Sequence, residues 1–133
     1  MAKVYKVSKE PKIGKQKQYK FAQRVKAFHF PVFSNWKLLV IFTNNMAKTL
    51  RKYPQTRCIE KESGDYALTV NVPKEDLTFV VLPHDCCLRT VAHEAFHAME
   101  HILGAHDISL SGEIGAYHMG YLVREISKWR STL

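Results

Sequence analysis

The chain has 133 residues, 46% of them hydrophobic, and a formal net charge of +8. This length and apolar content suffice for one domain, residues 1–133, whose core needs no disulfide or metal staple. No apolar run approaches the roughly 18 residues of a membrane-spanning helix, so we expect no membrane partner.

Positive charge is concentrated in the first part of the chain. Residues 1–57 hold 14 Lys and Arg and one acid, whereas residues 58–133 hold 6 basic and 11 acidic residues. We expect residues 1–27 to form a basic arm or edge segment, without the apolar stretch of a signal peptide. Such a segment either keeps the protein soluble or binds nucleic acid or another acidic partner. The lysines that would contact this partner are Lys3, Lys6, Lys9, Lys12, Lys15, Lys17 and Lys20.

The next elements are a strand pair and a short helix. Residues 28–33 are aromatic and interrupted by Pro31, a pattern typical of an edge or irregular strand. Residues 36–43 form an apolar run that predicts a strand. Asn44 or Asn45 can then cap a helix over residues 46–53, which Pro54 would end.

A hairpin and two helices complete the expected fold. Residues 66–72 and 77–82 read as two strands joined by a turn, and either could be the edge that pairs with an extended peptide. An apolar helical pattern then predicts a helix over about 86–103, capped by Asp85 and ended by Gly104. A second helix over 111–126 has Ser111 as its predicted N-cap. Together these elements predict an α+β fold in which a small twisted sheet packs on the first helix.

The three cysteines, Cys58, Cys86 and Cys87, have no zinc-binding spacing. An odd count without such a spacing favours free thiols in a reducing compartment, and we therefore expect a cytoplasmic protein. Cys86 and Cys87 lie where the first long helix starts, a position that favours a thiolate. A pair of small buried residues is the simpler interpretation of this dipeptide.

The run His93-Glu94-Ala95-Phe96-His97 carries the chemistry of the chain. Residues four apart share one face of a helix, so His93 and His97 can both bind one metal ion. Glu94 lies next to that face and can act as the general base toward a water molecule. Two imidazoles with an adjacent carboxylate suit zinc-assisted hydrolysis.

A catalytic zinc requires a third protein ligand. Glu113, in the first turn of the second helix, is the residue that an αα-hairpin would bring back to the histidine pair. His106 and Asp107 in the connecting turn are alternatives. Tyr117 lies one turn after Glu113 and can either stabilise an oxyanion or pack in the core beside Tyr121.

The stretch Thr90–Ala98, followed by Glu113-Ile-Gly-Ala-Tyr117, resembles zincin-type metallopeptidases whose third ligand is a glutamate on a following helix. It is similar to short phage-encoded proteins that share an HEAxH helix and an ExxAY helix. The resemblance covers roughly residues 66–126 and implies one Zn²⁺ bound by His93, His97 and Glu113, with Glu94 as general base. We expect the zincin-like core to span residues 28–133. The resemblance implies a chemistry without a particular target. We expect a protein or peptide substrate and, if the protein is phage-encoded, the host cytoplasm.

The sequence thus predicts a zinc-dependent hydrolase, with peptide-bond cleavage as its reaction. A different class of function is also compatible with the charge pattern. The basic N-terminal part would then make this a nucleic-acid-binding or inhibitory protein of a phage or mobile element, with a structural metal or none.

Overall fold

The computed structural model describes residues 22–30, 33, 35–56 and 67–133. The described part is an α+β fold built on a four-stranded mixed sheet with the strand order β1-β2-β4-β3. β1 (Gln23–His29) is antiparallel to β2 (Lys37–Thr43), and β2 is parallel to β4 (Leu77–Pro83). β3 (Leu68–Val72) pairs antiparallel with β4. The lysines predicted to form a basic arm, Lys3 to Lys20, lie outside the described residues.

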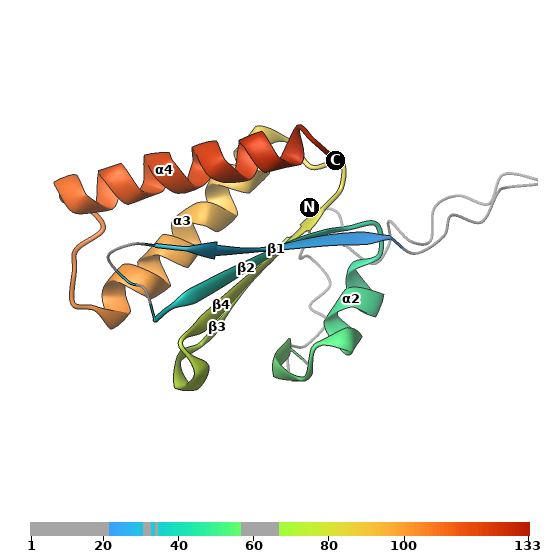
Figure 1. Cartoon of the computed structure of the whole chain (residues 1–133), viewed down its shortest axis with the longest axis horizontal. Helices are drawn as coiled ribbons and strands as arrows, with labels where there is room; N and C mark the ends of the chain where they lie inside the picture. The colour runs from blue at the N-terminus through green and yellow to red at the C-terminus, as the bar shows by residue number, and fades with distance from the viewer. Residues whose placement is uncertain (1–21, 31–32, 34, 57–66) are drawn as a thin grey trace, which may run out of the picture.

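Helices cover both faces of the sheet (Figure 1). α3 (Leu88–Ala105) and α4 (Glu113–Arg130) lie on one face, and α2 (Met46–Lys52) lies on the other. Two short 3₁₀ helices, Pro54–Thr56 and Pro73–Glu75, follow α2 and β3. In the described part of the chain, no helix is long and apolar enough to cross a membrane.

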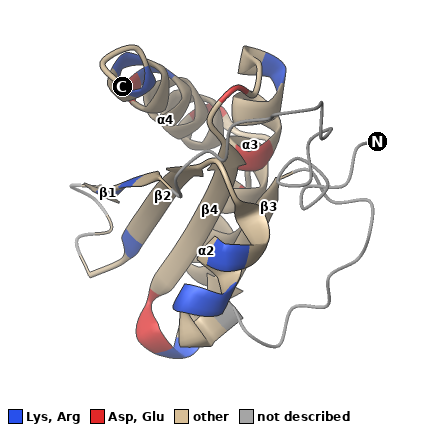
Figure 2. Ribbon diagram, turned by 90° about the vertical axis from the view of Figure 1, so that its right-hand side faces the viewer, with Lys and Arg blue, Asp and Glu red and all other residues tan. Residues whose placement is uncertain are grey.

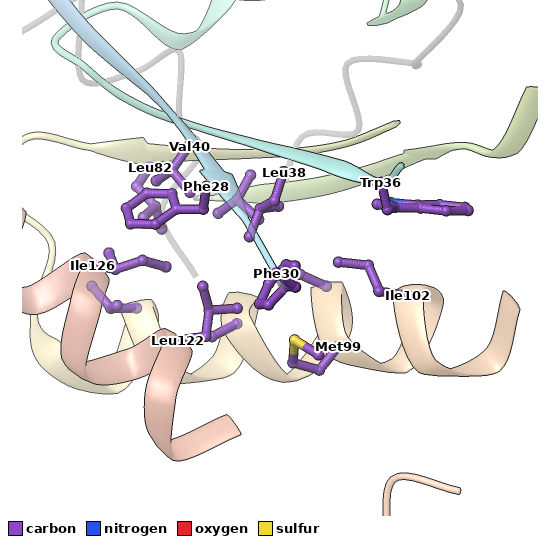
Figure 3. Close-up of a cluster of buried hydrophobic side chains, with 14 of the residues drawn as sticks. Phe28, Phe30, Trp36, Leu38, Val40, Leu82, Met99, Ile102, Leu122 and Ile126 are labelled. Carbon is purple, nitrogen blue, oxygen red and sulfur yellow. The ribbon is translucent and has the colours of Figure 1, made fainter. Parts of the chain in front are cut away.

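The main core lies between the sheet and the α3–α4 layer, and the central strands β2 and β4 contribute buried residues to it. Alternate residues of β2, such as Leu38, Val40 and Phe42, are fully buried on this side. They meet Met99 and Ile102 of α3 and two residues of α4, Leu122 and Ile126 (Figure 3). The other face of the sheet forms a smaller cluster with Met46 and Leu50 of α2. A central strand buried on both faces is expected to be almost uniformly apolar.

The hairpin prediction is confirmed, and the structure decides which strand is the edge. β3 lies at the end of the sheet, whereas β4 is enclosed between β2 and β3. Of the two strands proposed as a peptide-pairing edge, β3 is therefore the one with a side that no other strand of the described residues pairs with. β1 is the opposite edge and spans Gln23–His29, so the bounds predicted for an edge strand, residues 28–33, are wrong, and β1 begins inside the segment 1–27.

Helix α2 starts as predicted, because the Asn45 side chain accepts a hydrogen bond from the Lys48 backbone N–H at 2.9 Å. The predicted caps of α3 and α4 are wrong. Cys87, not Asp85, is the N-cap of α3, and Gly112, not Ser111, is the N-cap of α4. Neither residue caps its helix through a side-chain hydrogen bond.

The C-terminus of α3 also differs from the prediction, since Gly104 lies inside the last turn. The left-handed residue that ends the helix is Asp107, with a φ of 58°. The Ile108 N–H donates to the Leu103 carbonyl at 2.9 Å, and the Asp107 N–H donates to the Gly104 carbonyl at 3.1 Å. These two bonds form a Schellman motif. Aspartate tolerates this left-handed conformation better than most residues do, so glycine is not required.

Candidate metal site

The run His93–His97 lies in the middle of α3, the helix that follows β4. The buried face of the helix holds Val91, Ala95 and Met99 against the sheet and α4. His93 is exposed and His97 is partly exposed, one turn apart along the outer side of the same helix. Packing of the apolar face therefore fixes the side of α3 on which the two imidazoles lie.

The two imidazoles converge on each other. The Nε2 atoms of His93 and His97 are 3.2 Å apart, and the ring centroids are 4.7 Å apart. Two nitrogens bound to one zinc ion at about 2.05 Å with a tetrahedral angle lie about 3.3 Å apart. The observed separation matches this span, so the histidine pair fits two adjacent coordination positions of a zinc ion.

Glu94 is turned inward toward the edge strand. Only 7% of its surface is exposed, and its Oε1 accepts a hydrogen bond of 2.6 Å from the Thr69 hydroxyl of β3. The same hydroxyl lies 3.2 Å from the Glu94 backbone carbonyl. A buried carboxylate needs such a donor to offset the loss of water. Thr69 thus joins β3 to the predicted general base, a contact that the spacing of residues in the sequence does not indicate.

Like Thr69, Glu100 contacts a residue of the candidate site and was not predicted from the sequence. Its Oε1 lies 3.1 Å from Nδ1 of His97, on the opposite side of the ring from His93. The spacing of three residues on a helix permits this contact and could have identified it.

Glu113 and Tyr117 are both exposed in the first two turns of α4. Among residues 22–30, 33, 35–56 and 67–133, no three His, Cys, Asp or Glu side chains gather closely enough to hold a metal ion. The structure therefore brings the histidine pair together without grouping Glu113 with it, and the third ligand stays a prediction. Tyr117 is 71% exposed, so the alternative role in core packing does not hold.

The rival residues in the connecting turn, His106 and Asp107, have structural roles, and so does His118 of α4. His106 Nδ1 lies 2.7 Å from the Ile102 carbonyl oxygen, and its ring packs 4.3 Å from that of Phe33. His118 is buried against the same phenylalanine, with Nδ1 2.9 Å from the Ile114 carbonyl oxygen. Asp107 ends α3. These contacts explain the presence of the three residues without a metal.

Cys86 and Cys87 differ in environment at the start of α3. Burial raises the pKa of the Cys86 thiol to about 11, and Arg130 donates a hydrogen bond to the Cys86 carbonyl. Cys87 is exposed, and its contacts with the Thr90 backbone and hydroxyl lower the pKa of its thiol. Both thiols are free, as predicted, and the buried-pair interpretation holds for Cys86 alone. Cys58 lies outside the described residues.

Comparisons with models of protein families, with curated proteins and with solved structures find no match to this chain. The assignment of a function therefore rests on the residues of the α3 site and their geometry.

Proposed function

We propose that this protein is a zinc-dependent hydrolase, a metallopeptidase of the zincin type that cleaves peptide bonds. The observation that carries the proposal is the 3.2 Å separation of the His93 and His97 Nε2 atoms beside the inward-facing Glu94. This separation suits two ligands of one tetrahedral ion, and Glu94, the residue that follows His93, would supply the base that hydrolysis needs.

Each residue of the site has a distinct role in the proposed reaction. His93 and His97 would hold one Zn²⁺, and Glu113 would be its third ligand. A zinc ion bound in this way activates water and polarises a carbonyl group. Glu94 accepts a proton from the attacking water at Oε2, the oxygen that Thr69 does not hold, and then delivers it to the leaving amine nitrogen. The Tyr117 hydroxyl donates a hydrogen bond to the developing oxyanion.

The position of β3 favours an extended peptide as substrate. An edge strand can pair with such a peptide through backbone hydrogen bonds. β3 is an edge of the sheet, and its Thr69 contacts Glu94. A peptide added to β3 would consequently run beside the general base.

The first test is the zinc content of protein purified without chelator, measured by elemental mass spectrometry. We expect about one zinc per chain in the wild type and in Glu94→Gln, and none in His97→Ala. His101→Ala is the matched control, because His101 is exposed one turn further along α3. Loss of zinc in His101→Ala but not in His97→Ala would overturn the assignment.

The second test is cleavage of unfolded casein and of a mixed peptide library by the zinc-loaded protein. Glu94→Gln should retain zinc and lose at least 100-fold in turnover, a typical contribution of general base catalysis of about 10²–10⁴. Undiminished cleavage by Glu94→Gln would refute Glu94 as the base.

A second function is favoured by the charges of β1, β2 and α2. Residues 22–56 contain no acid, and their six basic residues lie on these elements: Arg24, Lys26, Lys37, Lys48, Arg51 and Lys52. Figure 2 shows this basic character on α2, whereas acidic residues lie on α3. Together with the preceding lysines, this part of the chain would bind nucleic acid. Salt-dependent DNA binding that persists in Glu94→Gln is the expected result, and no binding at low salt would exclude this function.

A further inference from the structure

The contact between His93 and His97 constrains where their protons lie. At 3.2 Å, the two Nε2 atoms are within hydrogen-bond distance, so two neutral imidazoles share one hydrogen between them. A neutral imidazole carries its hydrogen on one nitrogen and a lone pair on the other. One histidine of the pair must therefore donate through Nε2, and the other must accept there.

Glu100 determines which histidine accepts. An ionised carboxylate can only accept hydrogen bonds, so the Nδ1 of His97, 3.1 Å from Glu100 Oε1, must carry the hydrogen. The neutral His97 ring then has its lone pair on Nε2, directed at His93. It follows from the hydrogen-bond network that His93 is the Nε2–H donor.

We propose that Glu100 is a positioning residue for His97. Its contact with Nδ1 holds metal-free His97 in the Nδ1–H tautomer, whose Nε2 can bind a metal, while His93 is held in the Nε2–H tautomer. His97 can bind an ion through Nε2 without a change of tautomer, once the hydrogen bond from His93 is released. His93 must release its Nε2 hydrogen to solvent and take one up at Nδ1, so the ring remains neutral and no net proton is lost. The tautomer assignment follows from the metal-free geometry, and only its consequence for zinc rests on the proposed function.

The tautomers are measured directly by ¹⁵N–¹H correlation NMR of metal-free protein labelled at histidine. The measurement is made in alkaline buffer, in which imidazoles are neutral. His93→Ala and His97→Ala identify the two sets of signals. We expect the Nδ1–H form for His97 and the Nε2–H form for His93. An Nε2–H form for His97 in the wild type overturns the proposal.

Variants at Glu100 test whether its contact with His97 sets the His97 tautomer or is only a surface contact. Glu100→Ala should shift His97 toward a mixture of tautomers, and Glu100→Gln should restore the Nδ1–H form, because its amide oxygen accepts the same hydrogen. Glu125→Ala is the matched control, since Glu125 is a helical carboxylate whose Oε2 lies 4.0 Å from Lys128 Nζ, three residues on. A His97 tautomer unchanged in Glu100→Ala overturns the proposal.

Zinc affinity, measured by competition with a chromophoric chelator, provides the second readout. Loss of a residue that hydrogen-bonds to a metal ligand typically weakens metal binding by about 10–100-fold. Because the His97–Glu100 pair is exposed, we expect a loss of affinity at the lower end, about tenfold. His97 and Glu100 side chains are 41% and 49% exposed. Equal affinity of wild type and Glu100→Ala would refute the role of Glu100 while leaving the proposed function intact. If the wild type binds no zinc, the proposed function fails and the tautomer result still decides the role of Glu100.

Discussion

The two long helices hold their site residues in different ways. On α3, three site side chains have a defined partner: His93 and His97 contact each other, and Glu94 contacts Thr69. On α4, Glu113 and Tyr117 are exposed to solvent. Contacts within the fold therefore orient the α3 side chains of the candidate site. The positions of Glu113 and Tyr117 depend instead on where the first turns of α4 lie.

The difference has a physical cause in the packing of each helix. α3 follows β4 after a short turn and packs one apolar face on the sheet, so its rotation is fixed over its whole length. The first buried residue of α4 is Gly115, and it lies against the Leu110 backbone. The position of the α4 start therefore depends on this close backbone approach.

The largest effect is expected from Gly115→Ala. A Cβ at this position would lie 2.7 Å from the Leu110 Cα and still closer to its carbonyl group, and backbone atoms cannot yield as a flexible side chain can. We expect a loss of about 3 kcal/mol in the free energy of unfolding, the upper part of the range for overpacking. Urea denaturation followed by circular dichroism measures it.

Gly120→Ala is the matched control in the same helix, because no heavy atom lies within 4 Å of a Cβ there. This substitution should stabilise the protein by about 0.5–1 kcal/mol through helix propensity. Equal effects of the two substitutions would contradict the proposed role of the Leu110 contact.

Glu113→Ala tests whether α4 contributes to the site at all. As a direct ligand, Glu113 should contribute more than an outer-shell residue, so its loss should weaken zinc binding by more than about 100-fold, or about 2.7 kcal/mol. Isothermal titration with zinc measures the affinity. Asp107→Asn and His106→Gln are the controls, and a larger loss in either would transfer the third ligand to the connecting turn.

Thr69→Val should separate the proposed general-base role of Glu94 from metal binding. The substitution keeps the shape of the side chain but removes the hydrogen bond to Glu94, so we expect about tenfold slower turnover, or about 1.4 kcal/mol. Zinc affinity and KM should not change, and Thr69→Ser should restore turnover. A fall in zinc affinity equal to the fall in turnover would show instead that Thr69 stabilises the whole site.

The smallest effect on folding and on the candidate site is expected from alkylation of a cysteine at the start of α3. The lowered pKa of Cys87 gives a larger thiolate fraction near neutral pH, whereas the raised pKa of Cys86, about 11, keeps that buried thiol protonated. Iodoacetamide at pH 7 should therefore modify Cys87 and spare Cys86, and peptide mass spectrometry identifies the modified residue. Cys87→Ser should remove the signal, and modification of Cys86 in native protein would contradict the difference in environment.

Local patterns in the sequence predicted the elements that depend on neighbouring residues. The helix capped by Asn45, the hairpin of β3 and β4 and the two helices around His93 and Glu113 all appear where periodicity and turn residues indicated. The predicted boundaries were less accurate. The end of α3 needed only a residue that tolerates a left-handed backbone, and Asp107 served as well as Gly104.

Contacts between distant residues could not be predicted in this way. The partner of Glu94 lies 25 residues away on β3, and β3 became an edge only because β4 paired with β2 on its other side. The sequence by itself determined that two imidazoles and a carboxylate share one turn of a helix, because helical spacing is a local property. The tertiary structure decided that Glu94 faces an edge strand, because only the packing of α3 on the sheet brings these segments together.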